Sequence, residues 1–227
     1  MSIDFANILE SKFNKNCKKT AVDKFMLFLC QLNFMSNFTV VVSDSRILLL
    51  ILKSFVALNI IPNVFQDGNK VNFLEIPSLK IRFVHINCYL KGSIYTLASQ
   101  FNIEFKKIFY PKKWNKPEFY NYVGNSPDLN DFYDFSDTKE DQEDKKTYHS
   151  NLTNPYNFNT NLINTTRYES KLFFTCCLCF LKQCFELQDL VHNFAQNKND
   201  KLEVIHPFGW KISSLSGFTY AVFAYFL

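Results

Sequence analysis

The first third of the chain alternates between helical and extended hydrophobic patterns. Apolar residues recur at helical spacing over 20–35, where Thr20 can cap the first turn. The run FTVVV at 38–42 is short and rich in β-branched residues, which predicts a buried strand. The polar segment 43–45 interrupts that run and can cap a helix over 46–58. A helix, a strand and a second helix are therefore expected in succession.

A hairpin and a further strand follow. The segments 63–65 and 71–76 flank Gln-Asp-Gly-Asn at 66–69, where the glycine can supply the positive φ that a hairpin turn needs. Another strand is predicted over 80–85 and a helix over 93–101.

The second half of the chain is expected to be organised differently, with loops followed by helices. Residues 106–165 contain four prolines and are expected to be rich in loops. A long helix is predicted over 166–193 and a last helix over 212–226. This order of elements predicts an α/β domain with a mixed sheet.

Composition narrows the function classes. Hydrophobic residues make up 47% of the 227 residues and charged residues 20%, so the chain can bury a core. The 26 phenylalanines accompany many asparagines and lysines, a bias that AT-rich coding DNA produces and that carries no functional weight. Only five glycines are present, and neither GxGxxG nor GxxxxGK[ST] occurs, which excludes those two kinds of nucleotide site.

The charges are unevenly distributed. The net charge of +4 is too small to identify a nucleic-acid partner. Residues 128–144 contain eight of the 21 acidic residues, so the rest of the chain is distinctly basic. Such an acidic run is expected to be a solvated loop rather than a metal or partner site.

Seven cysteines are present, and four of them crowd into one apolar, helical stretch. These four are Cys176, Cys177, Cys179 and Cys184. We expect them to behave as small buried hydrophobic residues rather than as zinc ligands, because His192 and His206 are isolated from each other. The N-terminus has no apolar signal core, and the longest apolar run, 47–52, is too short to span a bilayer. The expected location is a reducing intracellular compartment, either nucleus or cytoplasm, with the mitochondrion as a further option.

Four short motifs between residues 70 and 127 stand in a recognisable order. They are FVHI at 83–86, LASQF at 97–101, KIFYPKKWN at 107–115 and YVGNSP at 122–127. Their order and spacing resemble the exonuclease region of protein-primed family-B DNA polymerases, found in linear plasmids, some DNA viruses and self-synthesising transposons. The resemblance extends over about residues 20–227. It implies an α/β, ribonuclease-H-like 3′–5′ exonuclease domain with a mixed sheet flanked by helices.

The resemblance also implies a domain organisation. Residues 1–19 are expected to be an N-terminal extension, 20–193 the exonuclease-like domain with a loop-rich acidic insert at about 106–165, and 194–227 a linker and helix leading toward the palm. The palm motifs Asp-x-x-Ser-Leu-Tyr-Pro and Asp-Thr-Asp do not occur, so the chain resembles a polymerase truncated before its palm.

The family's exonuclease holds two Mg²⁺ ions with four carboxylates, and this sequence departs from that pattern. Asp4 and Ala6 are the only candidates for the first motif, Asp-x-Glu. In the second motif Leu49 stands in the place of the aspartate, and Asp44 nearby is better placed to cap a helix. In the third motif Tyr168 is retained but Leu172 replaces the aspartate. We therefore expect no bound metal, no cofactor and no catalytic residue, with the substituted side chains filling a core.

His85 takes the place of a family aspartate at the end of a strand. It is expected to be a partly buried polar residue rather than a catalytic base.

Binding of DNA remains an expectation. Five lysines between residues 106 and 116 are interleaved with aromatic residues, a mixture that suits phosphates and stacked bases. The candidate nucleic-acid-binding residues are Lys107, Lys112, Lys113, Trp114 and Tyr168. The same segment could equally be an ordinary lysine-rich loop anchored by its aromatic residues. The sequence thus predicts a polymerase fragment without exonuclease activity that binds single-stranded DNA weakly and without specificity, with no membrane association. The alternative is a non-catalytic nucleic-acid-binding or protein-interaction module on the same fold.

Overall fold

The computed structural model divides the chain into two compact units. One comprises residues 1–92 and 181–227, and the other comprises residues 93–180. The residues that the structure describes are 22–26, 38–57, 60–77, 80–152, 154–194 and 206–207. Of the helix predicted over 20–35, residues 22–26 are helical and the remainder lie outside the described residues, as does the helix predicted over 212–226.

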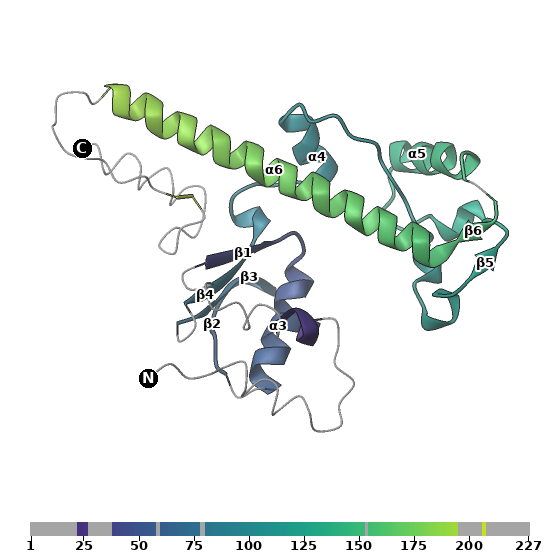
Figure 1. Cartoon of the computed structure of the whole chain (residues 1–227), viewed down its shortest axis with the longest axis horizontal. Helices are drawn as coiled ribbons and strands as arrows, with labels where there is room; N and C mark the ends of the chain where they lie inside the picture. The colour runs from purple at the N-terminus through teal and green to yellow at the C-terminus, as the bar shows by residue number, and fades with distance from the viewer. Residues whose placement is uncertain are drawn as a thin grey trace. The chain divides into compact units, whose positions relative to one another are not determined.

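A four-stranded mixed sheet forms the centre of the first unit (Figure 1). Its strands are β1 (Phe38–Val42), β2 (Asn63–Asp67), β3 (Lys70–Ile76) and β4 (Ile81–His85), in the order β1-β4-β3-β2. The β1–β4 pair is parallel, whereas β3 is antiparallel to both of its neighbours. This topology confirms the α/β class and the mixed sheet. The interior strand β4 is buried at four consecutive positions, as expected where both faces of a strand are covered.

The hairpin between β2 and β3 turns at Gly68, as the sequence predicts. Gly68 has φ +54°, a conformation that glycine adopts without a steric penalty. Beyond the turn, the rings of Phe65 and Phe73 stack with their centroids 4.1 Å apart. A register shift between Phe65 and Gln66 interrupts the ladder, which is the mark of a β-bulge.

Helix α3 (Ser45–Ala57) begins where the polar segment after β1 ends. The Asp44 carboxylate accepts a hydrogen bond from the Arg46 backbone N–H at 2.8 Å, so the predicted role of Asp44 as a helix cap is confirmed. Leu48 and Phe55 on one face of the helix are fully buried, and the Phe55 ring meets Phe83 of β4 edge-on at 6.1 Å. Figure 1 shows α3 alongside the sheet, where these side chains build the hydrophobic core.

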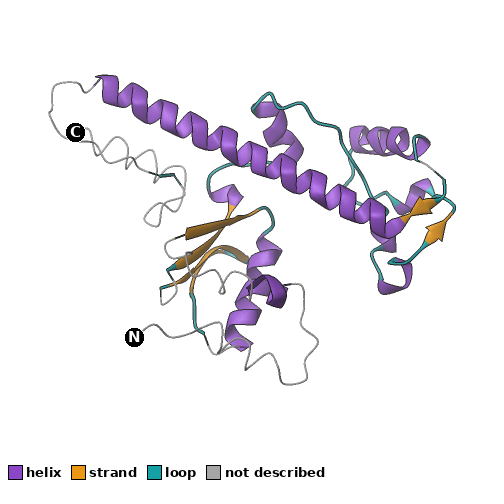
Figure 2. Ribbon diagram, viewed as in Figure 1, coloured by secondary structure: helices purple, strands orange, loops and turns teal. Residues whose placement is uncertain are grey.

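The second unit is mainly helical (Figure 2). Its elements are α4 (Ile94–Gln100), α5 (Lys139–Ser150), the N-terminal part of α6 (Phe158–Phe194), three 3₁₀ turns (Lys112–Trp114, Pro117–Phe119 and Leu129–Asp131) and the short strands β5 (Val123–Gly124) and β6 (Tyr156–Asn157). Helix α4 begins as predicted, because the Ser93 side chain accepts a hydrogen bond from the Thr96 backbone N–H.

Residues 106–165 contain more helix than the sequence suggests, and the interpretation of the acidic run as a solvated loop is wrong for residues 139–144. Thr138 and Asp141 form a reciprocal capping box that starts α5 inside the run. The long helix α6 also begins earlier than predicted, at Phe158 instead of 166. The Asn157 side chain accepts a hydrogen bond from the Thr160 backbone N–H at 2.9 Å, which supplies the cap.

Candidate functional site

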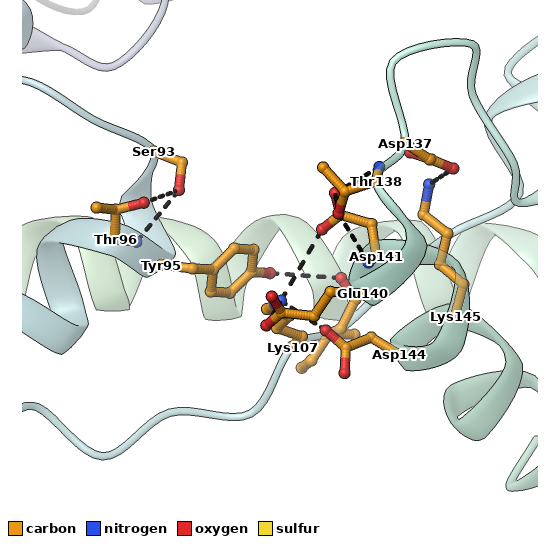
Figure 3. A network of polar contacts seen from close by, with 11 residues as sticks. Ser93, Tyr95, Thr96, Lys107, Asp137, Thr138, Glu140, Asp141, Asp144 and Lys145 are labelled. Atoms are coloured by element: carbon orange, nitrogen blue, oxygen red, sulfur yellow. Dashed lines mark hydrogen bonds and ion pairs between the residues drawn. The ribbon is translucent and has the colours of Figure 1, made fainter.

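The basic segment, residues 106–116, does not present all of its charges to solvent. The Lys107 ammonium donates a hydrogen bond to Asp144 at 2.5 Å and lies 3.6 Å from Glu140 and 3.9 Å from Asp141 (Figure 3). All three carboxylates come from one face of α5. The hydrogen bond to Asp144 is the main cause that raises the pKa of Lys107. The acidic helix therefore occupies the place that a nucleic-acid phosphate would take at this lysine.

The next two predicted cations are also engaged. Lys112 donates to Asp134 at 2.9 Å, and this bond raises the pKa of the lysine. Lys113 donates to the Asn130 backbone carbonyl at 2.6 Å and keeps its charge unpaired. Among the described residues, no ion pair reaches Lys106, Lys113 or Lys116. Three of the five lysines thus keep a charge that no described carboxylate pairs, and one of the three, Lys113, is held by a backbone carbonyl.

Trp114 lies in a cluster of aromatic rings. Its ring stacks on Phe119 at 4.7 Å and meets Tyr122 edge-on at the same distance. The indole N–H donates to Asp131 at 3.0 Å. With one face of the ring stacked and its N–H satisfied, Trp114 contributes to the fold of this unit. A change in DNA binding on substitution of Trp114 would therefore mix structural and binding effects.

The YVGNSP motif has a structural role that the sequence alone does not reveal. The Tyr122 hydroxyl donates to the Asn125 carbonyl at 3.0 Å, so its side chain folds across the intervening Gly124. A Cβ at Gly124 would lie 2.7 Å from the Tyr122 hydroxyl oxygen, closer than real contacts allow. The glycine therefore leaves room for the Tyr122 ring to lie against the backbone.

Tyr168 contacts the start of the basic segment. Its hydroxyl accepts a hydrogen bond from the Lys106 backbone N–H at 2.6 Å. The neighbouring Glu169, which the sequence reasoning did not single out, accepts a bond from the Tyr95 hydroxyl at 3.2 Å. Burial raises the pKa of Glu169 and that of Tyr95. The structure thus brings together Tyr168, the basic segment and a half-buried carboxylate.

A cavity of about 530 Å³ lies beside the lysine that α5 pairs. Its lining includes Phe105, Lys106, Lys107, Tyr148 and Asn161. Asp144, the partner of Lys107, lines the same cavity, so Lys106 is the cation there that forms no ion pair with a described residue, beside two aromatic rings and the amides of Asn151 and Asn161. The assignment of Lys107, Lys112, Lys113, Trp114 and Tyr168 to nucleic-acid binding stays a prediction.

The pairing of the basic segment with α5 was missed by sequence reasoning. Two signals could have indicated it. Thr138 followed three residues later by Asp141 matches a capping box, which predicts a helix inside the acidic run. The run also follows the lysines after only about a dozen residues, so opposite charges were available for local pairing.

The positions that the resemblance assigns to metal ligands have hydrocarbon side chains in different environments. Leu172 is 6% exposed, as expected for a core residue. Leu49 is 41% exposed, so the prediction that its substitution fills a core is wrong. Helical geometry explains this, because Leu48 already points into the core and the next residue is rotated away from it.

Neither leucine offers an oxygen ligand, so these positions do not fit a pair of magnesium ions. Within the described residues, no group of three or more His, Cys, Asp or Glu side chains is arranged to hold a metal ion. Asp4 and Ala6 lie outside the described residues.

The cysteine-rich stretch lies on α6, as predicted. Cys176 and Cys184 are buried, while Cys177 and Cys179 are partly buried, and all four are free thiols. Burial raises the pKa of Cys177 to about 12 and that of Cys184 to about 11, which keeps both thiols protonated at neutral pH. The prediction of small buried hydrophobic residues is confirmed for Cys176 and Cys184, whereas Cys177 and Cys179 are only partly buried.

Comparison with known proteins gives one relationship. The chain is 28% identical over 145 residues to a "Probable DNA polymerase" of Ascobolus immersus, a match that covers 63% of this chain and 11% of that protein. The chain thus spans about a tenth of the length of this relative. No protein-family model matches the chain. No solved structure matches it either. The similarity supports a relationship to a DNA polymerase.

The sequence predicts no membrane association, and the helices that the structure describes bear on this point. None of these helices combines the length and the apolar character that crossing a bilayer requires.

Proposed function

We propose that this chain is the exonuclease-like segment of a protein-primed, family-B DNA polymerase and that it lacks exonuclease activity. The observation that carries the proposal is the similarity to a probable DNA polymerase over 145 residues. The motif series between residues 70 and 127 narrows the proposal to the exonuclease region of that family.

The architecture supports a ribonuclease-H-like fold. Its parallel β1–β4 pair continues into the antiparallel strands β3 and β2, and α3 connects β1 to the hairpin. This is a mixed α/β sheet of the general kind that the resemblance implies.

The loss of activity follows from coordination chemistry. The family's two-metal reaction needs anionic oxygen ligands at positions where this chain has Leu49 and Leu172. Asp44 cannot substitute freely for the missing carboxylate, because it caps α3 and pairs with Arg46 at 2.5 Å. The remaining role is weak, sequence-independent contact with single-stranded DNA through lysines of the basic segment.

The test combines two assays on the full chain. Incubated with a labelled single strand and Mg²⁺ or Mn²⁺, the protein should leave the strand intact, while fluorescence anisotropy at low salt should show binding of micromolar or weaker affinity. Shortening from the 3′ end that co-purifies with the protein and stops on addition of EDTA would contradict the loss of activity.

Absence of DNA binding even at low salt would favour the other candidate, a protein-interaction module on the same fold. This candidate is supported by the exposed apolar residues of α3, which are Ile47, Leu49, Leu50 and Val56.

A further inference from the structure

A polar cavity of about 620 Å³ lies in the first unit at the edge of the sheet where β1 and β4 end. The two parallel strands finish side by side, with Val42 paired to His85. Ser43 and Asn87, which follow these strand ends, both line the cavity. The crevice outside the carboxyl ends of parallel strands is the usual ligand position in open α/β sheets.

Polar and charged residue types dominate the lining of this cavity. The ten described residues that line it include no Ala, Val, Leu, Ile or Met and no Phe, Tyr or Trp. Asn72, one of the lining residues, lies at the β-bulge of the β2–β3 hairpin. Its backbone carbonyl accepts a hydrogen bond from the Cys88 thiol at 3.8 Å. Ligand pockets are ordinarily lined by apolar groups, so this composition selects for a strongly polar ligand.

The charges in the cavity favour an anion. Two lysines, Lys70 and Lys91, line it, both are exposed, and no ion pair joins either of them to another described residue. Of the two acids, Asp44 is already neutralised by Arg46, whose guanidinium also holds the pKa of that carboxyl below its usual value. Asp67, at the end of β2, is the only other carboxylate among the described residues of the lining. The uncompensated balance is therefore positive.

His85 also lines the cavity and is held by a hydrogen bond. Its Nε2–H donates to the Ser43 carbonyl oxygen at 3.3 Å. Burial lowers the pKa of His85, and the nearby Lys70 adds to this effect, while the Ser43 carbonyl and Asp44 oppose it. A dianion bound beside Lys70 would stabilise the imidazolium, so the histidine can report on occupancy.

We propose that this cavity binds a phosphate monoester of nucleotide size. Lys70 and Lys91 would hold the phosphate, the side-chain amides of Asn72 and Asn87 would donate further hydrogen bonds, and Asp67 would accept one from a sugar hydroxyl. The volume exceeds what phosphate alone requires and lies within the usual range for small-molecule sites. The inference does not rest on the proposed function, because it is argued from the volume and the charges of this cavity, two of whose lining residues, Asp44 and His85, also lie at or beside motifs of the resemblance.

The test is a titration of the full chain, labelled at histidine and asparagine, followed by NMR. AMP should perturb the side-chain signals of Asn72 and Asn87 and raise the pKa of His85, whereas adenosine should do neither. The Lys70→Gln/Lys91→Gln variant should bind AMP about a hundredfold more weakly, since each lost charge-assisted hydrogen bond is worth roughly tenfold. The matched variant Lys24→Gln/Lys53→Gln removes the same charge from exposed positions outside the cavity and should bind AMP unchanged.

Two sources of the monoester can be told apart in the same experiment. A free nucleotide is the source if AMP binds but a 5′-phosphorylated oligonucleotide does not. The end of a strand is the source if a 5′-phosphorylated oligonucleotide binds more tightly than the same oligonucleotide with a 5′-hydroxyl. Both results support the site. Equal binding of adenosine and AMP, or AMP binding that survives loss of both cavity lysines in a variant with a native spectrum, would overturn it.

Discussion

Lys145 is a charged residue that the fold has buried. It lies on the otherwise hydrophilic helix α5, yet its side chain is 5% exposed and its ammonium lies 2.5 Å from the Asp137 carboxylate, itself 8% exposed (Figure 3). The Phe109 ring centroid is 5.7 Å away. Asp137 also accepts a hydrogen bond from the Asp134 backbone N–H, which ties the pair to the loop before the helix. A buried ion pair needs both partners, because removal of one leaves the other as an uncompensated charge in the interior.

Replacing Lys145 with methionine should therefore destabilise the protein by about 3–5 kcal/mol, because the Asp137 carboxylate would stay buried without its partner. Urea unfolding followed by circular dichroism measures the change. The matched control is Lys146→Met, one residue along the same helix, whose side chain is 65% exposed. It should change the free energy of unfolding by less than about 0.5 kcal/mol. Equal unfolding midpoints for the two variants would refute the structural role of the pair.

At the scale of elements, the start of α3 depends on one carboxylate. Because the side chain of Asp44 caps the helix through the Arg46 backbone N–H, Asp44→Ala should destabilise the protein by about 1 kcal/mol. Its hydrogen bonds with Arg46 lower the pKa of Asp44 in the folded state. The charge-dependent part of the stabilisation is therefore complete above the unfolded pKa, near 4, and is lost as the pH falls through the folded pKa.

Urea unfolding at neutral pH and near pH 3 measures both effects. The matched variant is Asp44→Asn, which keeps a capping oxygen but cannot titrate. It should retain most of the stability at neutral pH and lose less than the wild type on acidification. If Asp44→Asn and Asp44→Ala were equally destabilised at neutral pH, the cap would not be the source of the effect.

Helix α5 controls how many lysines the basic segment can offer. Lys106, Lys113 and Lys116 form no ion pair with a described residue. A plot of the logarithm of the DNA-binding constant against the logarithm of the salt concentration should therefore have a slope of about −2, because each neutralised phosphate of a single strand contributes roughly 0.7. The variant Glu140→Gln/Asp144→Asn removes two partners of Lys107. It should tighten DNA binding several-fold at low salt and steepen the slope by about 0.7, which anisotropy titrations at increasing salt would measure.

A control must separate the release of Lys107 from a general gain of positive charge. Asp128→Asn/Glu143→Gln changes the net charge by the same amount, and neither side chain is paired with Lys107. This variant should leave the salt slope near that of the wild type. Identical slopes for the two variants would mean that α5 does not mask a binding surface.

At the scale of the whole molecule, the uneven charge distribution is balanced within one compact unit. The acidic run and the basic segment both belong to the unit of residues 93–180, where the carboxylates of α5 and of the loop before it pair with the lysines. The net charge of +4 belongs to the whole chain, whereas this unit holds ten lysine and arginine residues against eleven acidic residues. The nuclease and binding assays of the full chain belong to this scale, because they measure the activity left after all such pairing.

Local patterns in the sequence determined much of the first unit. The β-branched runs, the polar break before α3 and the glycine in the hairpin specify strands, a capped helix and a turn through interactions between near neighbours, so they were predictable from the chain alone. The cysteine-rich helix was predictable for the same reason, since its apolar spacing is local.

Only the tertiary structure decided which residues of the candidate site are available. Whether Lys107 faces solvent or α5, whether Leu49 or Leu48 enters the core, and whether Lys70 and Lys91 share a cavity all depend on contacts between segments far apart in sequence. Pairing of charges is set by distance in space and by burial, neither of which a composition or a motif spacing encodes. The sequence therefore determined the elements and the absence of carboxylates at the two leucine positions, while the fold decided where the remaining charges can act.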